Sequence, residues 1–502
     1  MTYSTTSSVL SPSGLGVIAA FLISLYLVRV VFTVIFNLYF HPLAKFPGPA
    51  SRAGVYASDY WKLYDGSHPQ NLKALHDKYG DVVRIRPDSL TFNNAAAWKG
   101  DRMWAGMDIY GTRPRRGQLQ KDPQFYSIAG ACNDADHSRM RKLLSHAFSD
   151  SALRQQEDLL TPHFELLVQR LQEQIDGPTA GKVDIKNWYN FLTFDVIGDM
   201  AFGESFGALE SGTYHKWIAN LFGGIKYARF LSIASFYRPA MDVLMLLVKA
   251  VPTISEMKRE HMEFCREKTR HRLETETDRR DFMSYILRHN DEKGMSRDEL
   301  MNTSELLILA GSETTATLLS GLTYLLLSTP CAYAKVQREV REAFASADDI
   351  TLTSTGQLPY LHACIEEALR IYPPVPIALP RLTRPEGDVI GGTKVAVAQL
   401  ATNYSSRNFH EPETFAPERW LPDAPERFHG DIREAMNPFS TGPRNCIGKN
   451  LAYNEMRSVM ARMLWHFDMH LWEESRNWLE QKVYFMWEKE ELNIVLSRRK
   501  DF

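Results

Sequence analysis

The chain has 502 residues, of which 44% are hydrophobic, and 58 lysines and arginines stand against 60 aspartates and glutamates. This composition is ordinary for a folded protein and supports one large core or two to three domains, which excludes wholesale disorder and fibrous repeats. A net charge of -2 lacks the basic excess of nucleic-acid-binding proteins, so we predict no nucleic-acid partner. Five widely spaced cysteines without a CxxC pair argue against a disulfide framework and a cysteine-rich zinc site.

The N-terminal region is apolar. Residues 14–28 carry no charge, and a second apolar run, 30–40, follows Arg29. A membrane-spanning helix needs about 20 apolar residues, and an arginine at mid-bilayer costs about 3 kcal/mol unless it lies near one end. We therefore predict a span near residues 10–30 and a membrane anchor over 1–40. The alternative is a cleaved signal peptide, but a basic start and a small-residue cleavage site are missing. Arg29 and Lys45 favour a cytosolic body.

The remainder, 41–502, is predicted to be one domain. It begins with a proline-rich connector over 41–50, which cannot form regular helix. Ser296 and Glu299 form a predicted capping box, and a mostly apolar run then continues to Leu327. A helix of this length spans roughly 50 Å and must cross the core. Short strands are expected at residues 82–86, 393–398 and 492–496, so the predicted fold is mainly α with small β-sheets.

The strongest local signal lies at residues 439–448, FSTGPRNCIG, where a Gly-Pro turn precedes Cys446 and an amphipathic helix follows it. A cysteine at a helix N-terminus faces unpaired backbone N–H groups and the positive end of the helix dipole, and both favour the thiolate. A thiolate can bind a metal or act as a nucleophile. Gly442 and Gly448 have no side chains, so a flat, wide ligand can approach the backbone there.

This segment resembles the haem-ligand signature F-x-x-G-x-R-x-C-x-G of the cytochrome P-450 monooxygenases and matches every fixed position. The resemblance implies that Cys446 ligates the iron of haem b and that Phe439, Gly442, Arg444 and Gly448 contact this cofactor. It also implies the cytochrome P-450 fold, a triangular helical body with an N-terminal transmembrane anchor. The alternative is an inert buried cysteine at a loop-to-helix junction.

Two further motifs follow in the family's order. Residues 367–370, EALR, resemble the E-x-x-R helix motif, whose i,i+3 spacing places both charged side chains on one helix face. Residues 415–420, FAPERW, resemble the segment that supplies a second arginine. The resemblance implies a buried structural triad of Glu367, Arg370 and Arg419 behind the haem. Buried charges must be fully paired, so losing any member should be severe.

Residues 310–315, AGSETT, lie within the long helix and resemble the family's oxygen-activation motif. Glu313 and Thr314 place an acid and an alcohol in a largely apolar helix, where burial is costly without a partner or a purpose. The implied catalytic role is proton relay during oxygen activation, and Gly311 is expected to loosen the helix and make room over the metal. In the alternative interpretation Thr314 bonds back to its own helix and Glu313 lies on a wet face.

By resemblance, three arginines bind the haem propionates. Arg444 lies two residues before the ligand, Arg381 follows the E-x-x-R helix, and Arg141 lies on an early helix. The family commonly shows W-x-x-x-R on that helix, whereas this chain has His137 in place of the tryptophan. Arg139 competes with Arg141 for the assignment.

The resemblance implies a haem-thiolate monooxygenase that inserts one oxygen atom from O2 into a C–H or C=C bond. Residues 145–149 and 452–457 resemble fungal members of secondary metabolism. An apolar small molecule such as a polyketide, terpenoid or alkaloid intermediate is the expected substrate, contacted by segments near 105–128, 205–250, 375–379 and 484–487. Two alternatives remain: a haem-thiolate isomerase or dehydratase that does not need O2, and a non-catalytic haem sensor or carrier.

Electrons must come from outside, because the chain lacks a G-x-G-x-x-G phosphate loop. We expect NADPH as the source, through a separate NADPH–cytochrome P-450 reductase, with cytochrome b5 as a second candidate donor. Arg139, Lys142 and Lys449 are a candidate docking patch; the alternative is that they are ordinary solvated charges. The expected location is the endoplasmic reticulum membrane, crossed once, with the catalytic domain in the cytosol.

Overall fold

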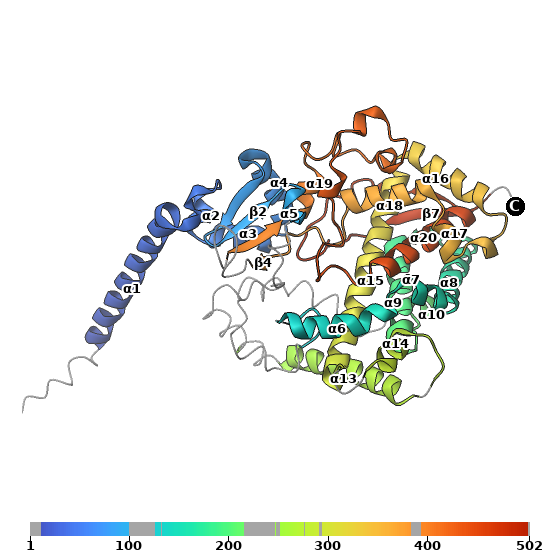
Figure 1. Cartoon of the computed structure of the whole chain (residues 1–502), viewed down its shortest axis with the longest axis horizontal. Coiled ribbons are helices and arrows are strands. Elements are labelled where there is room, and N and C mark those ends of the chain that lie inside the picture. The colour runs from blue at the N-terminus through green and yellow to red at the C-terminus, as the bar shows by residue number, and fades with distance from the viewer. Residues whose placement is uncertain are drawn as a thin grey trace, which may run out of the picture.

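The protein is described from a computed structural model, which covers residues 12–99, 126–131, 133–214, 246, 252–275, 277–290, 294–382 and 393–499. One long helix projects from a body in which a small sheet lies beside the base of that helix and further helices pack on the far side (Figure 1). The helices are α1 (Pro12–Ile35), α2 (Ala50–Gly54), α3 (Ala57–Tyr64), α4 (His68–Tyr79), α5 (Ala96–Lys99), α6 (Asp134–Ala147), α7 (Asp150–Gln155), α8 (Glu157–Asp176), α9 (Ile185–Phe202), α10 (Ala208–Ser211), α13 (Pro252–Glu274), α14 (Phe282–Arg288), α15 (Arg297–Leu327), α16 (Pro330–Ala343), α17 (Leu352–Thr355), α18 (Pro359–Ile371), α19 (Gln399–Asn403) and α20 (Lys449–His466).

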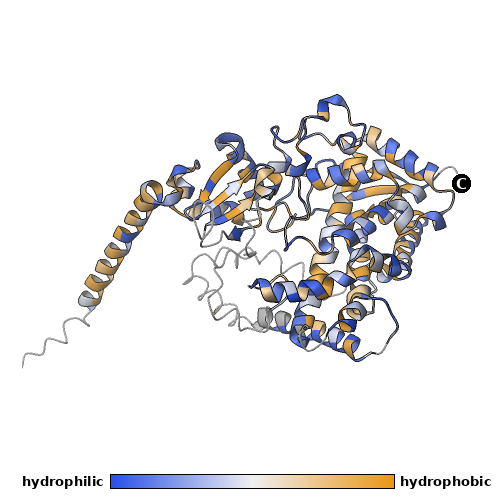
Figure 2. Ribbon diagram, in the orientation of Figure 1, coloured by the Kyte–Doolittle hydropathy of each residue, from blue (hydrophilic) through white to orange (hydrophobic). Residues whose placement is uncertain are grey.

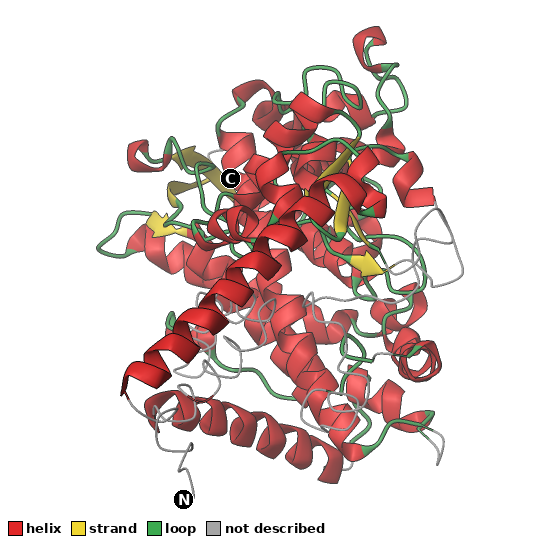
Figure 3. Cartoon of the chain, turned by 90° about the vertical axis from the view of Figure 1, so that its left-hand side faces the viewer, coloured by secondary structure: helices red, strands yellow, loops and turns green. Residues whose placement is uncertain are grey.

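The strands form two small sheets. They are β1 (Val82–Arg86), β2 (Ser89–Phe92), β3 (Lys182–Asp184), β4 (Arg381–Leu382), β5 (Lys394–Val397), β6 (Phe467–Leu471) and β7 (Asn493–Arg498). The first sheet has the order β1-β2-β5-β4 and the second the order β3-β7-β6. Strand β2 pairs in parallel with β5, so that Ser89 lies opposite Lys394, and the other pairs are antiparallel. The predicted class, mainly α with small sheets, is confirmed (Figure 3).

Helix α15 crosses the core as its length predicts. It begins at Arg297 behind the expected capping box: the Ser296 hydroxyl accepts from the Glu299 N–H at 3.2 Å, and Glu299 Oε2 accepts from the Ser296 N–H at 2.8 Å. Every residue from 315 to 326 is buried. The helix packs mainly against α9, which is also buried over most of its length. Its apolar character therefore reflects burial inside the protein.

Helix α1 is apolar and exposed on nearly all sides. The apolar helical stretch runs from Gly14 to Phe40, and none of its most apolar window is buried in the protein (Figure 2). It continues past Arg29 to Ile35 and ends in a π-helical turn, Phe36–Phe40, so the helix is longer than the membrane span predicted near residues 10–30. The residues after Arg29 are as apolar as those before it, and no helix breaker occurs before Pro42. Such a helix supports membrane anchoring.

Buried hydrogen bonds fix the base of α1 to the body. The Asn37 amide donates to the Gly54 carbonyl at 3.0 Å, and Arg84 of β1 donates to the Asn37 carbonyl at 2.8 Å. The connector that follows contains a 3-10 turn of four residues, Pro42–Lys45, and the next α-helix begins at Ala50. Proline at the first position of a helical turn costs no hydrogen bond, which explains why the turn forms there.

Candidate functional site

Cys446 lies at the end of a tight loop that leads into α20. The Cys446 N–H donates to the Phe439 carbonyl at 2.9 Å, and the Asn445 N–H donates to the Gly442 carbonyl at 3.1 Å. Gly442 has φ of 80°, a left-handed conformation that glycine adopts without strain, and Ser440 has φ of 59°. The predicted Gly-Pro turn thus closes the loop on itself and directs Cys446 to the N-terminal end of α20.

Helix α6 holds this loop through Arg141. Its guanidinium donates to the Asn445 carbonyl oxygen at 2.5 Å and to the Asn445 side-chain oxygen at 2.6 Å. Arg139 points elsewhere: it pairs with Glu299 at the start of α15 at 2.7 Å and with Asp136 at 3.2 Å. The structure therefore brings Arg141, and not Arg139, to the cysteine loop. Arg139 is two residues along the helix, which turns its side chain to another face.

The electrostatics at Cys446 are balanced between opposing effects. The surrounding protein raises the pKa of the Cys446 thiol, while the Gly448 N–H, Arg141 and Lys449 lower it. The expected helix-terminus effect is present, although the net shift of the pKa is upward. The Cys446 side chain is exposed, and a bound cation would favour its thiolate. A Cβ built on Gly448 would meet no atom within 4 Å, so no side chain covers the backbone beside the sulfur there.

Positive charge is concentrated next to the loop. Arg444 is buried and donates to the Ala131 carbonyl at 3.0 Å, and Arg381 is buried and donates to the Ser440 hydroxyl at 2.9 Å. Burial, together with the charge of Arg444, lowers the pKa of Arg381 to about 10. The pKa of His137 falls to about 4 because of burial and the nearby Arg444 and Arg141. The histidine is therefore neutral near pH 7, and its neighbourhood favours an anion.

These residues fit a haem. The donor set combines one cysteine sulfur on a glycine-flanked loop with two buried arginines, and burial, followed by the charge of Arg444, lowers the pKa of Arg381. An anionic group with two carboxylates beside the sulfur ligand would offset these positive charges. The start of the cysteine loop is also fixed by packing, since Phe439 contacts Tyr453 of α20 with ring centroids 5.2 Å apart.

The three predicted triad residues meet in the structure, and all three are fully buried. Arg370 donates to both Glu367 oxygens at 2.8 and 2.9 Å, and Arg419 donates to Glu367 Oε1 at 3.0 Å. Two more donors of the segment 415–420, the Ala416 N–H and the Trp420 indole, complete the shell of Glu367 at 3.0 and 2.8 Å. Glu367 therefore accepts five hydrogen bonds.

The middle of α15 differs in part from its expected arrangement. The Thr314 hydroxyl donates to the Ala310 carbonyl of its own helix at 2.6 Å, as expected in the alternative in which Thr314 bonds back to its helix. A Cβ at Gly311 would lie 2.7 Å from Ile197 Cδ1 on α9. The expectation that Gly311 makes room over a metal is therefore wrong. The absent side chain lets α15 approach α9 closely.

Glu313 is not on a wet face. Its carboxylate is buried and pairs with Lys489 at 2.7 Å, and the exposed fractions of the two side chains are 6% and 5%. Lys489 also donates to the Thr317 hydroxyl, one turn further along α15, at 2.8 Å. Sequence reasoning missed Lys489, because a lysine in the run Glu488–Glu491 is typical of a solvated loop. It also missed Asn445 and Asp431, which pairs with Arg419.

The predicted substrate segments are only partly within the described residues. Segments 105–125, 215–245 and 247–250 lie outside them. Val375, Ile377 and Leu379 line a small cavity of about 30 Å³ that also touches Arg381 and Ser440. Residues 484–487 form a hairpin tip closed by a bridge between Val483 and Trp487.

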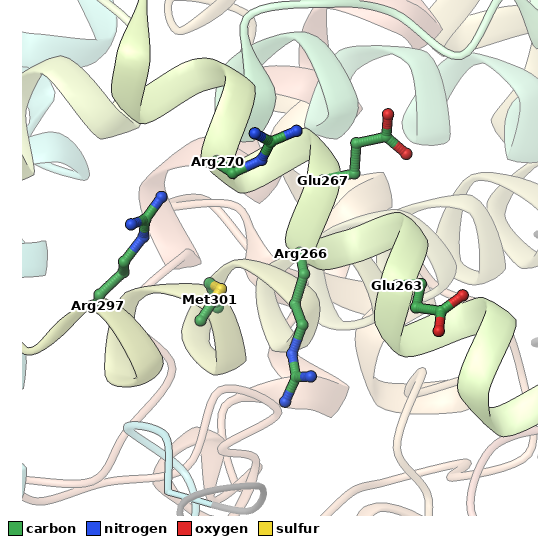
Figure 4. A pocket seen from close by; sticks show the side chains of 6 residues that line it. All are labelled: Glu263, Arg266, Glu267, Arg270, Arg297 and Met301. Atoms are coloured by element: carbon green, nitrogen blue, oxygen red, sulfur yellow. The ribbon is translucent and has the colours of Figure 1, made fainter.

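A larger hollow of about 440 Å³ lies elsewhere, between α13 and the start of α15. None of the predicted site residues belongs to its lining. Figure 4 shows the residues that do line it: Glu263, Arg266, Glu267, Arg270, Arg297 and Met301. Arg297 pairs there with Glu274 at 3.3 Å, although both side chains are more than half exposed. This charged, solvated surface does not fit an apolar substrate.

Comparison with known proteins places this arrangement in a family. The cytochrome P-450 family model matches residues 55–495. The chain is 43% identical to cytochrome P-450 monooxygenase aclL of Aspergillus oryzae, over 93% of this chain and 96% of that protein. It is 40% identical to the trichothecene C-4 hydroxylase of Trichoderma arundinaceum, over 96% of this chain and 98% of that protein. It is 39% identical to cytochrome P-450 monooxygenase efuB of Hormonema carpetanum, over 98% of each chain.

The chain belongs to the cytochrome P-450 family. It is a haem-thiolate monooxygenase, and the predicted family, fold and enzyme class are confirmed. Its relatives are named as monooxygenases and a hydroxylase, which does not favour an O2-independent isomerase or a non-catalytic haem carrier. The family uses haem with a cysteine thiolate, a redox partner and apolar substrates.

Proposed function

We propose that this enzyme hydroxylates or epoxidises an apolar secondary-metabolite intermediate, such as a polyketide, terpenoid or alkaloid, with haem b ligated by Cys446. The observation that carries the assignment is the loop that holds Cys446 at the start of α20 beside buried arginines. The similarity to fungal monooxygenases and a trichothecene hydroxylase supports the substrate class.

The residues of the chain divide into those that hold the cofactor and those that handle protons. Arg444, Arg381 and Arg141 would bind the carboxylates of the haem, with His137, Phe439, Gly442 and Gly448 around it. When bound, the haem supplies the oxygen-activating chemistry, which a thiolate ligand promotes by donating electron density. Glu367, Arg370 and Arg419 keep the region behind the cofactor folded, because Glu367 and Asp431 together compensate the charges of the two arginines.

On α15, Glu313 and Thr314 would move protons toward the reacting centre. Glu313 Oε2 has no hydrogen-bond partner among the described residues, so this oxygen can take up and release a proton without breaking a protein contact. The Thr314 hydroxyl bonds to Ala310 and retains its lone pairs as acceptors. In this proposal the acid and the alcohol act from neighbouring positions of α15, each with acceptor capacity that its contacts within the protein leave open.

Electrons would arrive from NADPH through a separate NADPH–cytochrome P-450 reductase, with cytochrome b5 as a second donor. Lys142 and Lys449 are exposed and flank the cysteine loop, one on α6 and one at the start of α20. They form the docking patch in this proposal. Arg139 does not contribute, since it is committed to Glu299 and Asp136.

The proposed location is the endoplasmic reticulum membrane, with residues 1–40 as a single-pass anchor and 41–502 as the cytosolic catalytic domain. The exposed apolar surface of α1 supports the anchor. The hydrogen bonds from Asn37 and Arg84 support a fixed orientation of the body on the membrane.

The absorption spectrum of the reduced, carbon-monoxide-bound protein tests the ligand. A strongly red-shifted Soret band that disappears in Cys446→Ala is expected. Cys331→Ala, which changes an exposed cysteine outside the loop, is the matched control and should retain the band. A band that survives the loss of Cys446 would disprove the ligand assignment. NADPH consumption with purified reductase, compared with product formed from candidate apolar substrates, then tests the reaction.

A further inference from the structure

A buried ion pair joins the centre of α15 to the C-terminal hairpin. Lys489 Nζ lies 2.7 Å from Glu313 Oε1 and 2.8 Å from the Thr317 hydroxyl. Burying an ammonium and a carboxylate is expensive, and their attraction offsets this cost only when the geometry is good. An apolar pair of similar volume would serve packing equally well or better. Stability alone therefore does not explain why this buried position holds an ion pair.

The lysine is held by a rigid support. The hairpin tip is closed by the Val483–Trp487 bridge, and the Glu488 N–H donates to the Lys482 carbonyl at 2.8 Å. The Trp487 indole donates to the Pro373 carbonyl at 2.8 Å, which ties the hairpin to the end of α18. Lys489 therefore approaches Glu313 from a fixed element, and its ammonium group pairs with Oε1 of the carboxylate.

Two further charged side chains act electrostatically on the pair. Asp184 and Lys186, at the start of α9, pair at 3.3 Å, and their side chains are 14% and 15% exposed. Both act on the pKa of Lys489: burial lowers it, Glu313 and Asp184 raise it, and Lys186 lowers it. Burial raises the pKa of two phenols, Tyr214 and Tyr372, and the charge of Glu313 adds to each shift. Charged and ionisable groups outside α15 therefore interact electrostatically with the pair.

We propose that Lys489 is a positioning residue for oxygen activation, which holds Glu313 as a carboxylate, fixes Oε1 and leaves Oε2 to exchange protons. This inference rests on the proposed proton-relay role of Glu313. It adds a partner for that residue from a segment 176 positions away along the chain.

The inference differs from a purely structural role in its pH dependence. Without Lys489, the buried carboxylate of Glu313 loses the cation that lies 2.7 Å from it, and an unpaired buried charge is disfavoured. We expect turnover to fall about tenfold near pH 7 and to recover as pH rises, because higher pH favours the carboxylate. A lysine that only tethers the hairpin would give a loss without this profile.

The experiment uses the full-length, haem-loaded protein with purified reductase, and measures NADPH-driven O2 consumption between about pH 6 and about pH 9. Lys489→Met should show the loss and the recovery at high pH, while Lys489→Arg should stay close to the parent. Lys482→Met, which removes an exposed lysine of the same hairpin, is the matched control and should leave the profile unchanged. Infrared spectroscopy should show a new protonated-carboxyl band in K489M that is absent from E313Q/K489M.

Three outcomes separate the possible failures. A parent-like pH profile in K489M without a new carboxyl band would overturn the inference alone. Parent-like O2 consumption in E313Q would overturn the role of Glu313 itself. If K489M does not fold, E313Q/K489M takes its place, because it leaves no buried charge at the pair. The inference then requires this double variant to match E313Q, and a further loss of more than about threefold would contradict it.

Discussion

Glu367→Gln tests the energetics of the buried triad. The substitution preserves shape but replaces one acceptor oxygen with an amide that donates. Glu367 accepts five hydrogen bonds, three at Oε1 and two at Oε2, so either orientation of the amide sets donor against donor. It also leaves two buried guanidinium groups with Asp431 as the remaining carboxylate bonded to Arg419. Removing one member of a buried pair costs about 3–5 kcal/mol, and we expect a loss in this range.

The assay is the free energy of unfolding of the haem-loaded protein in denaturant, followed by the Soret band and by tryptophan fluorescence. The Trp420 indole donates to Glu367 Oε2 at 2.8 Å, so its emission should report the local change. Haem content after purification should fall in parallel. A cost below about 1 kcal/mol with full haem content would refute the reasoning that these charges depend on one another.

Glu418→Gln is the matched control. Glu418 is the residue before Arg419 in the same turn, and it pairs with Lys335 at 2.7 Å. The side chain of Lys335 is 53% exposed, so solvent screens this pair. We expect a cost of about 1 kcal/mol or less. A control loss as large as that of E367Q would show that the segment, rather than the buried charge, determines the effect.

Two further predictions concern the helices around the site. Gly311→Ala should cost about 1–3 kcal/mol in unfolding free energy, since its Cβ would lie 2.7 Å from Ile197 Cδ1, and Ile197→Val in the same chain should recover part of it because that atom is then absent. Burial raises the pKa of Glu455 to about 8, so this carboxyl binds a proton on folding. The protonated carboxyl therefore contributes to the free energy of unfolding at low pH, and this contribution is lost as pH rises from the ordinary glutamate pKa toward about 8. In Glu455→Gln, the free energy of unfolding measured over this pH range should depend less on pH.

Local sequence determined those features of the fold that depend on neighbours in the chain. The Ser296–Glu299 capping box fixes the start of α15 because both partners lie within one turn. The loop before α20 follows from Gly442, whose φ of 80° suits a tight turn. The Glu367–Arg370 pair follows from i,i+3 spacing. In each case the interaction is specified by residues a few positions apart, so the prediction needed no knowledge of the tertiary fold.

The errors and omissions are contacts between distant segments. Arg139 was a candidate for the haem and for docking, but it meets Glu299, 160 residues away. Gly311 is explained by Ile197 on another helix. Lys489 lies in an acidic run that favours a solvated loop, yet it is buried against α15. No local pattern encodes these partners, because they depend on how helices and hairpins pack.

Two of the buried glutamates, Glu367 and Glu313, differ in how far hydrogen bonds satisfy their carboxylates. Both oxygens of Glu367 are saturated by donors, so its charge is fixed and no proton can reach it without breaking contacts. Glu313 receives Lys489 on one oxygen, and its other oxygen has no hydrogen-bond partner within the described part of the chain. A buried acceptor left unsatisfied costs about 1–3 kcal/mol. Because such unsatisfied acceptors are rare in folded proteins, the open oxygen of Glu313 supports the proposal that this residue, and not Glu367, moves protons.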